Sequence, residues 1–302
     1  MSSNAIQRSQ ICAVVVTYFP KAECEDNFAA LAPQVGMVLV IDNGSSPETL
    51  EFVATAARRV GATVVRLGSN LGIATALNAG LEIAREKGFR WLATFDQDSR
   101  CTPGMIEEMA RVRECYPQYE RLAIISPSYV DRVQGFAVRQ RRSEAAGEGW
   151  RILPTTMTSG NLVNVEIATA IGGFDDSLFI DYVDHEFCLR LRSHGYRVVE
   201  ATHATLLHSL GTMQRRRFLF RLIATTNHPA VRRYYQSRNR LLIWRRYWRR
   251  ELQWVAQDIR RFVFESLYIL LYEQQASAKL SMIARGLRDG IRDVRGPLRL
   301  EG

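Results

Sequence analysis

WLATFDQDSR, residues 91–100, ends an apolar run in two closely spaced carboxylates, Asp96 and Asp98. Such a run is typical of a buried strand, and ligands of open α/β sheets bind beyond the carboxyl ends of the strands. Residues two apart on an extended backbone point to the same side, so the two carboxylates would lie together. A divalent metal is the simplest compensation for two such charges. A D-x-D pair alone is weak evidence, because turns and helix N-termini are also rich in Asp.

Alternating strands and helices surround this stretch along the chain. Buried strands are predicted over 11–18, 37–41, 62–67, 89–95, 122–130 and 196–201. Helices are predicted within 19–34, 47–60, 68–88, 103–115 and 183–195, the last closed by Gly195. From about residue 213 the chain is predicted to be helical throughout. This alternation predicts a mostly parallel sheet covered by helices on both faces, with ligands gathered where the strands end.

Composition is that of a folded protein, with 302 residues of which 47% are hydrophobic. Residues 1–10 lack the apolar core of a signal peptide, and the apolar stretch SLYILLY at 266–272 is too short to span a bilayer. The five cysteines show no CxxC pair or zinc-like spacing, and their odd number argues against a disulfide framework. We therefore expect a cytoplasmic protein whose thiols are reduced and mostly structural.

The positive charge of the chain is concentrated near its end. Residues 1–214 hold 20 Lys and Arg against 24 Asp and Glu, a net charge of −4, whereas residues 215–302 hold 20 against 7, a net charge of +13. Tryptophans, phenylalanines and tyrosines are interleaved with these arginines. Such a segment suits an anionic surface, either a membrane or a nucleic acid. The alternative is a solvated helical face around ordinary core aromatic residues.

Seven motifs that occur in order along the chain make the function more specific. They are VVVTYFP, VIDNGSS, NLGIATALNAG, FDQDS, SGNLV, GGFDDSLFIDYVDHEFCLRLRSHGYRV and LLHSLGT. Together they resemble the inverting family 2 glycosyltransferases of GT-A fold. The forms FDQDS, FIDYVDHEFCLR and RRYYQSRN resemble the bacterial rhamnosyltransferases in particular. The resemblance covers roughly residues 11–240 and implies a GT-A catalytic domain over 1–212, followed by a basic, amphipathic helical extension over 213–302.

The resemblance also implies a donor site. Its nucleotide-sugar-binding residues would be Thr17, Tyr18, Pro20, Asp42, Asn70, Gly72, Asn78, Asp96, Gln97 and Arg238, and Asn239 would accompany Arg238 on either the diphosphate or the acceptor. Asp98 and His208 would hold Mg²⁺ or Mn²⁺, although the DQDS form leaves open which of Asp96 and Asp98 touches the metal. Strand ends and tight turns explain several of these residue types equally well. An ordinary core or surface role is the alternative for His208.

The catalytic base implied by the resemblance is Asp184. A sugar hydroxyl is a weak nucleophile at neutral pH, so a carboxylate must take its proton as it attacks the anomeric carbon. Asp181 is the alternative candidate for the base. A structural explanation for both residues is that acidic side chains are favoured near a helix N-terminus. The acceptor pocket would be bordered by Ser159, Gly160, Asn161 and Glu186.

The predicted function is the transfer of L-rhamnose from dTDP-β-L-rhamnose to a saccharide or lipid-linked saccharide, with inversion to an α-linkage. The products would be cell-surface polysaccharides such as the O-antigen of lipopolysaccharide. We expect peripheral contact with the anionic inner face of the plasma membrane, and homo-oligomers are possible. One alternative is another donor, such as a UDP-sugar, or a rhamnolipid-forming rhamnosyltransferase. An alternative from another class is a nucleic-acid-binding protein that acts through the basic tail, which would leave the ordered motifs unexplained.

Overall fold

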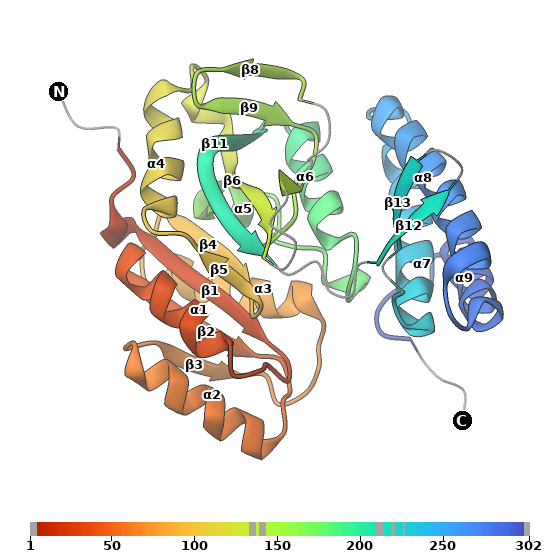
Figure 1. The fold of residues 1–302 in the computed structure, drawn as a ribbon. Coiled ribbons are helices and arrows are strands. Elements are labelled where there is room, and N and C mark those ends of the chain that lie inside the picture. The colour runs from red at the N-terminus through yellow and green to blue at the C-terminus, as the bar shows by residue number, and fades with distance from the viewer. Residues whose placement is uncertain are drawn as a thin grey trace. The chain divides into compact units, whose positions relative to one another are not determined.

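The structure of the chain is a computed structural model that describes residues 5–132, 137–138, 143–208, 214–218, 221–225 and 227–298 (Figure 1). The described residues form two compact units. The first unit contains residues up to 179 together with 183–208, and the second contains 180–182 together with the residues from 214 onward. The predicted domain boundary at 212 lies outside the described residues.

Four parallel strands form one half of the sheet in the first unit. They are β1 (Ile11–Thr17), β2 (Met37–Asp42), β3 (Thr63–Arg66) and β4 (Trp91–Asp96), in the order β3-β2-β1-β4. The helices that connect them are α1 (Cys24–Leu31), α2 (Pro47–Arg59) and α3 (Ile73–Glu86). The predicted strand and helix alternation over the first hundred residues is confirmed.

The other half of the sheet is mixed in direction. The strands there are β6 (Leu122–Asp131), β10 (Asn161–Asn164), β11 (Arg197–His208), β9 (Trp150–Leu153) and β8 (Ala145–Gly147), and the short strands β5 (Ser99–Cys101) and β7 (Ala137–Val138) pair with β11 and β6. Strand β10 runs antiparallel between β4 and β6, while β11 is parallel to β6. The sheet is thus less parallel than predicted, since β10 is antiparallel to both of its neighbours. The two-residue link between β8 and β9 is also too short for a parallel crossover.

The remaining helices of the first unit are α4 (Met105–Cys115), α5 (Val165–Ala170) and α6 (Val183–Ser193), with single 3₁₀ turns at Arg8–Gln10, Ala32–Gln34, Tyr119–Arg121 and Asp176–Leu178. Strand β1 is buried along its whole length. Ile11, Ala13 and Val15 face a core shared with α1, α2 and α4. On the other face, Val14 packs against α3 at Gly80, where a Cβ would come within 2.3 Å of the Val14 side chain. Helices on both faces therefore explain why β1 is apolar at every position but its last.

All five cysteines are unpaired, and four of them are buried. Burial raises the pKa of Cys12 to about 12 and that of Cys24 to about 11. Thiols with such pKa values are protonated at neutral pH and are poor nucleophiles. Their burial is consistent with a structural role.

The second unit contains a hairpin and three long helices. The hairpin pairs β12 (Gln214–Phe218) with β13 (Arg221–Thr225), and α7 (Ala230–Tyr247), α8 (Leu252–Tyr272) and α9 (Ala276–Ile291) follow. The prediction that the chain is helical from residue 213 is therefore wrong for the hairpin, whose strands include Phe218, Ile223 and Thr225, residue types that favour extended backbone. Among the described residues, no helix has both the length and the apolar character needed to cross a membrane.

Candidate functional site

Three neighbouring strands of the first unit end in polar side chains at the same edge of the sheet. Thr17 ends β1 opposite Asp42, the end of β2, and Asp96 ends β4 opposite Val16. Thr17 Oγ1 donates to Asp42 Oδ1 at 3.3 Å, while Asp42 Oδ2 accepts from the backbone amides of Gly44 and Ser45 at 3.2 and 3.0 Å. The buried Asp42 carboxylate thus shapes the loop after β2 as well as lying at the site.

The side chain of Gln97 joins the loops after β1 and β4. Its Oε1 accepts from the Tyr18 amide at 2.7 Å, and its Nε2 donates to the Tyr18 carbonyl at 3.2 Å. The Tyr18 and Phe19 rings are exposed and meet edge to face at 4.8 Å, whereas the neighbouring Pro20 is buried. Phe19 has a φ of 47°, in the left-handed region that side chains rarely adopt. The two hydrogen bonds from the Gln97 side chain to the Tyr18 backbone therefore hold the Tyr18 and Phe19 rings beside the strand ends.

The loop between β3 and α3 is held from two sides. Asn70 Oδ1 accepts from Asn43 Nδ2 at 3.2 Å and from the Gly72 amide at 3.1 Å. Gly72 has a φ of 90°, and a Cβ there would lie 2.5 Å from the Phe179 carbonyl oxygen. The Ile73 amide donates to that same carbonyl at 2.9 Å. Glycine is thus required at position 72 for backbone packing.

Asn78 lies on α3 and binds protein backbone. Its Nδ2 donates to the Phe174 carbonyl at 2.8 Å, and its Oδ1 accepts from the Phe174 amide at 2.8 Å. Both functional atoms of the amide are therefore engaged with the segment that precedes α6. In this structure Asn78 thus fastens α3 to the segment at Phe174.

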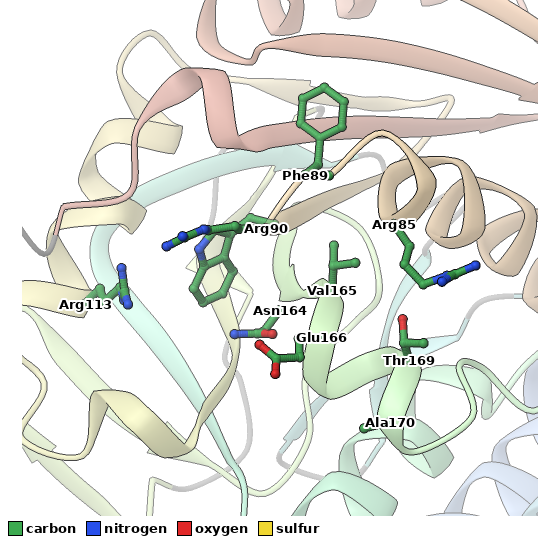
Figure 2. A pocket seen from close by; sticks show the side chains of 11 residues that line it. Arg85, Phe89, Arg90, Arg113, Asn164, Val165, Glu166, Thr169 and Ala170 are labelled. Atoms are coloured by element: carbon green, nitrogen blue, oxygen red, sulfur yellow. The ribbon is translucent and has the colours of Figure 1, made fainter.

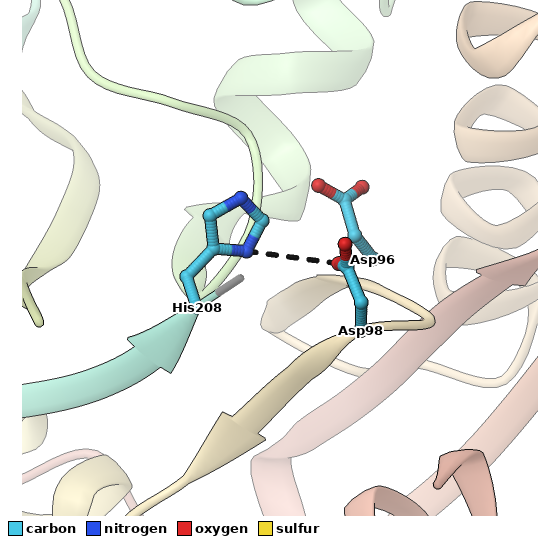
Figure 3. A group of neighbouring side chains, drawn as sticks. All are labelled: Asp96, Asp98 and His208. Carbon is cyan, nitrogen blue, oxygen red and sulfur yellow. Dashed lines mark ion pairs between the residues drawn. The ribbon is translucent and has the colours of Figure 1, made fainter. Parts of the chain in front are cut away.

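Asp96, Asp98 and His208 come together at the strand ends (Figure 3). One potential ligand atom from each of the three lies within 4.8 Å of the other two, and His208 Nδ1 is 3.7 Å from Asp98 Oδ1. Asp98 Oδ1 is buried and has no hydrogen-bond partner among the described residues. A buried carboxylate oxygen without a partner is costly unless a cation occupies its lone pairs. Two carboxylates and an imidazole fit Mn²⁺ or Mg²⁺, so these residues suit a divalent metal.

A chain of hydroxyl groups fixes these side chains. Ser159 Oγ accepts from the Asp96 amide at 3.0 Å and donates to Ser99 Oγ at 2.7 Å, and Ser99 Oγ is 2.7 Å from His208 Nδ1. Ser99 and His208 also face each other in the β5–β11 pair. Partners of this kind orient the first ligands of metal sites. Residues 209–212 of the LLHSLGT motif lie outside the described residues.

Ser159, Gly160 and Asn161 support the metal-site residues from within the protein. The Gly160 amide donates to the Thr94 carbonyl at 2.6 Å, and Asn161 Nδ2 donates to the Met157 carbonyl at 2.7 Å. Tyr129 is fully buried and its hydroxyl donates to the Ser159 carbonyl at 2.9 Å. Ser159 and Asn161 are themselves buried, so they do not present free surface to an acceptor.

Asp184 is the second residue of α6 and remains partly accessible, with its side chain 23% exposed. Its Oδ1 accepts from the His185 amide at 2.7 Å, and no hydrogen bond to its Oδ2 is found within the described part of the chain. Burial, and to a smaller extent the charge of Asp184, raises the pKa of Tyr129 well above its usual value. One oxygen of the Asp184 carboxylate is without a hydrogen bond among the described residues.

Glu186, predicted at the acceptor pocket, is buried in an ion pair. Arg190 approaches it at 2.9 Å and also donates to the carbonyls of Ile171 and Gly173. With 1% of its surface exposed, Glu186 anchors α6 to the preceding loop. This placement does not favour contact with an acceptor.

Arg238 and Asp181 belong to the second unit. Arg238 is fully buried, donates to Asn239 Oδ1 at 2.9 Å and lies over the rings of Tyr234 and Tyr235. Its Nη1 also donates to the Gly296 carbonyl of the same unit. Asp181, the rival base, pairs with Arg232 at 3.1 Å.

A cavity of about 640 Å³ lies away from these residues (Figure 2). It is lined by Arg85, Gly88, Phe89, Arg90, Trp91, Arg113, Asn164, Val165, Glu166, Thr169 and Ala170. Trp91 begins β4 and pairs with Asn164 at the end of β10, so the cavity is at the opposite end of the strand from Asp96. None of the predicted site residues lines it.

Three residues of the arrangement were not singled out from the sequence: Phe19, Ser99 and Tyr129. The positive φ of Phe19 and the partners of the buried Tyr129 hydroxyl depend on tertiary structure. Ser99 lies inside the FDQDS motif, directly after Asp98, so its position in the motif was the one available signal.

Known proteins are similar to this chain in sequence. The family described as Glycosyl transferase family 2 matches residues 12–161. The dTDP-rhamnosyl transferase RfbF of Shigella flexneri is 29% identical over 308 aligned residues, which cover 95% of this chain and 97% of that protein.

Solved structures show the same fold. TarS 1-349 of S. aureus in complex with UDP-GlcNAc is similar with a TM-score of 0.64 and 14% identity, covering 94% of this chain and 81% of that one. The mannosyltransferase PcManGT of Pyrobaculum calidifontis, in complex with GDP-Man and Mn²⁺, is similar with a TM-score of 0.53 and 14% identity, covering 96% and 76%. The predicted GT-A fold is confirmed.

Proposed function

We propose that this chain, whose residues 12–161 match the family described as Glycosyl transferase family 2, transfers L-rhamnose from dTDP-β-L-rhamnose to a saccharide or lipid-linked saccharide acceptor. The observation that carries the proposal is the similarity to a dTDP-rhamnosyl transferase along 95% of the chain. The donor would lie at the strand ends, with its nucleotide beside Thr17, Tyr18 and Asp42. The product would be part of a cell-surface polysaccharide such as the O-antigen of lipopolysaccharide.

A divalent cation, Mg²⁺ or Mn²⁺, would be held by Asp98 and His208, with Asp96 beside them. When bound, it would neutralise the charge that develops on the departing dTDP. The grouping of the three ligand atoms and the unpartnered Asp98 Oδ1 support this assignment. Ser99 and Ser159 would keep the ligands in place before the donor arrives.

Asp184 would act as the general base. Its partly exposed carboxylate has an oxygen without a hydrogen bond among the described residues, so it can accept the proton of the attacking acceptor hydroxyl. Attack on the face opposite the departing nucleotide inverts the anomeric centre, giving an α-linked rhamnoside from the β-linked donor. Glu186 and Arg238 have no direct part in this proposal, because both are buried in contacts of their own.

The apolar face of α8 supports peripheral contact with an anionic membrane. The residues Leu252, Ile259, Val263, Leu267 and Leu270 recur at helical spacing and are between 36% and 64% exposed. Exposed arginines flank them, at positions 246, 249 and 250 just before the helix and at 260 and 261 within it. An apolar stripe bordered by arginines fits the boundary of an anionic bilayer. A contact with a second copy would bring two such basic surfaces together, which like charges oppose.

Donor specificity is tested by measuring the nucleotide released from a panel of nucleotide sugars with acceptor extract, in Mn²⁺, Mg²⁺ or EDTA. We expect metal-dependent release from dTDP-rhamnose and none from UDP-sugars.

The Asp184→Asn variant should lose turnover while binding dTDP with nearly wild-type affinity in calorimetry. Release from UDP-sugars alone would overturn the rhamnosyl assignment, and loss of dTDP binding in Asp184→Asn would overturn the role of the base.

Membrane contact is tested by sedimentation with vesicles of phosphatidylcholine containing phosphatidylglycerol. The chain should sediment with these vesicles at low salt, and Val263→Asp should not. The control is Val231→Asp on α7, which changes a residue of similar exposure, 45% against 59%, outside the stripe. Equal binding of both variants would contradict the assigned face. Dimers of the wild type that Val263→Asp converts to monomers would assign the face to a second copy instead.

A further inference from the structure

The cavity at the start of β4 has a lining that the proposed transfer reaction does not use (Figure 2). Its volume of about 640 Å³ falls within the range of small-molecule sites in proteins. All of its lining residues lie between positions 85 and 170, so the first unit forms it alone. The backbone beside it is fixed, since the Arg90 amide donates to the Gln10 carbonyl and the Arg90 carbonyl accepts from the Val165 amide, both at 3.0 Å. The cavity is therefore built into the fold of this unit.

Part of the lining is apolar. Phe89, Trp91 and Val165 contribute rings and branched carbons, and Ala170 adds a methyl group. Trp91 and Val165 are both 3% exposed, so they form a firm surface backed by the core. A surface of this kind suits an apolar or aromatic part of a ligand.

Three side chains of the lining have N–H groups without an acceptor among the described residues. Arg90 makes no side-chain hydrogen bond or ion pair there, and the indole Nε1 of Trp91 makes no hydrogen bond. Asn164 Oδ1 accepts from the Ile167 amide at 3.1 Å, which turns its Nδ2 away from that amide, and no partner of Nδ2 is found in the described part of the chain. Buried N–H groups normally have acceptors. A ligand that brings acceptor oxygens would satisfy these donors.

Positive charge gathers at one side of the cavity. In Figure 2 the Arg90 and Arg113 side chains lie on the same side, with the Asn164 amide nitrogen turned toward them, and Arg85 lies on the other side. Arg85 is already paired with Glu82 on α3. Two guanidinium groups match the charge of a phosphate dianion, and their planar forks suit its oxygens.

We propose that this cavity binds a small organic phosphate. Its phosphate group lies between Arg90 and Arg113 and accepts from Asn164 Nδ2, while its organic part lies against Trp91. The lining carries three arginines against a single acid, the exposed Glu166, so its net charge favours an anion.

The cavity is separate from the donor site. Trp91 begins β4 and Asp96 ends it, which places the two sites roughly 16 Å apart along the strand. None of the residues assigned to donor, metal or base lines the cavity. The proposal therefore stands or falls independently of the rhamnosyl transfer.

Calorimetry with phenyl phosphate tests the proposal on the full chain. EDTA is present so that no divalent ion holds the probe at Asp98. We expect about one phenyl phosphate per chain, with an affinity at least about tenfold lower in the double variant Arg90→Met, Arg113→Met, the scale of one lost hydrogen bond to a charged group. The control is Arg111→Met, which removes a charge from the same helix as Arg113 but lies outside the cavity. It should bind as the wild type does.

A second variant tests the space instead of the charge. Ala170→Trp adds an indole to the lining and should also weaken binding, and it replaces the double variant if circular dichroism shows that the latter does not fold. Wild-type affinity in the double variant, or no binding at millimolar concentrations, would overturn the proposal. Binding that is lost in Asp98→Asn but kept in the double variant would place the probe in the donor site and overturn it as well. Inorganic phosphate that binds as tightly as phenyl phosphate would refute the role given to the apolar lining.

Discussion

Asp98 has one buried carboxylate oxygen, although its side chain as a whole is 46% exposed. This Oδ1 has no hydrogen-bond partner among the described residues, and His208 Nδ1 is 3.7 Å away. A bound cation would supply that missing partner. The side chains of Ser99 and Ser159, which hold His208 and the Asp96 backbone, have no such deficit, since each already has two partners.

Replacement of Asp98 should therefore act on metal rather than on folding. We expect Asp98→Asn to lower kcat/KM for the donor by about 100-fold or more, the scale of losing an electrostatic contact to developing charge. Its thermal midpoint in EDTA should be at least that of the wild type, because one repulsive charge is gone. Initial rates over a Mn²⁺ titration measure the first effect. A variant with wild-type rates and wild-type metal dependence would contradict the ligand role.

Asn78 should matter for stability alone. Asn78→Ala removes both hydrogen bonds to Phe174 and should lower the free energy of unfolding by about 1–3 kcal/mol. Its affinity for dTDP should stay that of the wild type. Urea unfolding and calorimetry measure the two quantities, with Glu82→Ala on the exposed side of α3 as the control expected to change stability by less than about 0.5 kcal/mol. Weakened dTDP binding without loss of stability would restore Asn78 to the donor site.

The sequence allowed some residues to be placed and not others. Asp42 and Asp96 could be assigned to strand ends because each closes an apolar run, and parallel neighbours end at one edge. The partners of Asn78, Glu186 and Arg238 could not be identified from the sequence. Phe174 and Gly296 are distant along the chain, and the burial of the Glu186–Arg190 pair depends on tertiary structure. Polar residues of these types look the same whether they bind a ligand or the protein.

At the scale of elements, strands that are buried on both faces were the easiest to predict. Strand β1 is a continuous apolar run up to Thr17, and its predicted bounds differ from the observed ones by one residue. The strands β8 and β10 have three and four residues, too few to show a period. The hairpin of β12 and β13 was missed because its arginines matched the helical, basic character of the residues that follow.

The helices α7 and α9 and the end of α8 meet at a buried cluster of charge. Glu273, next to the end of α8, pairs with Arg233 of α7 at 2.7 Å and with Lys279 of α9 at 2.9 Å, and the side chains are at most 7% exposed. Burial alone would raise the pKa of Glu273, but hydrogen bonds and charges from Lys279 and Arg233 lower it overall. The carboxylate therefore stays ionised between two buried cations.

Removing Glu273 should leave both cations buried without compensation. We expect Glu273→Ala to lower the free energy of unfolding by about 3–5 kcal/mol. The exposed pair of Arg59 and Glu25 provides the matched control, since Arg59→Ala should change stability by less than about 1 kcal/mol. Denaturant unfolding followed by circular dichroism measures both. Equal effects of the two substitutions would show that the buried cluster is not a special source of stability.

For the whole molecule, the partly buried His228 makes the free energy of unfolding depend on pH. His228 in the second unit has a pKa lowered to about 4, first by burial and then by the charges of Arg232 and Arg233. The unfolded chain therefore takes up this proton first as the pH falls. The stability contributed by neutral His228 is complete above about pH 6.5 and is lost as the pH falls towards about 4.

This linkage predicts that His228 causes part of the change of the free energy of unfolding with pH. Between about pH 6.5 and 4, His228 should account for a loss of up to about 3 kcal/mol in the free energy of unfolding. His228→Asn should reduce the slope over this range, whereas the more exposed His194 serves as a control through His194→Asn. Urea unfolding midpoints at several pH values measure this dependence of stability on pH for each protein. Identical slopes for the wild type and His228→Asn would contradict the prediction.

The central claim is that Asp96, Asp98 and His208 form a divalent-metal site for a nucleotide-sugar donor. Its most direct test is electron paramagnetic resonance of free Mn²⁺ titrated with the protein in the presence of dTDP. We predict that the wild type removes about one Mn²⁺ per chain from the free signal and that Asp98→Asn removes far less. A free Mn²⁺ signal that is the same with wild type, with Asp98→Asn and without protein would contradict the claim.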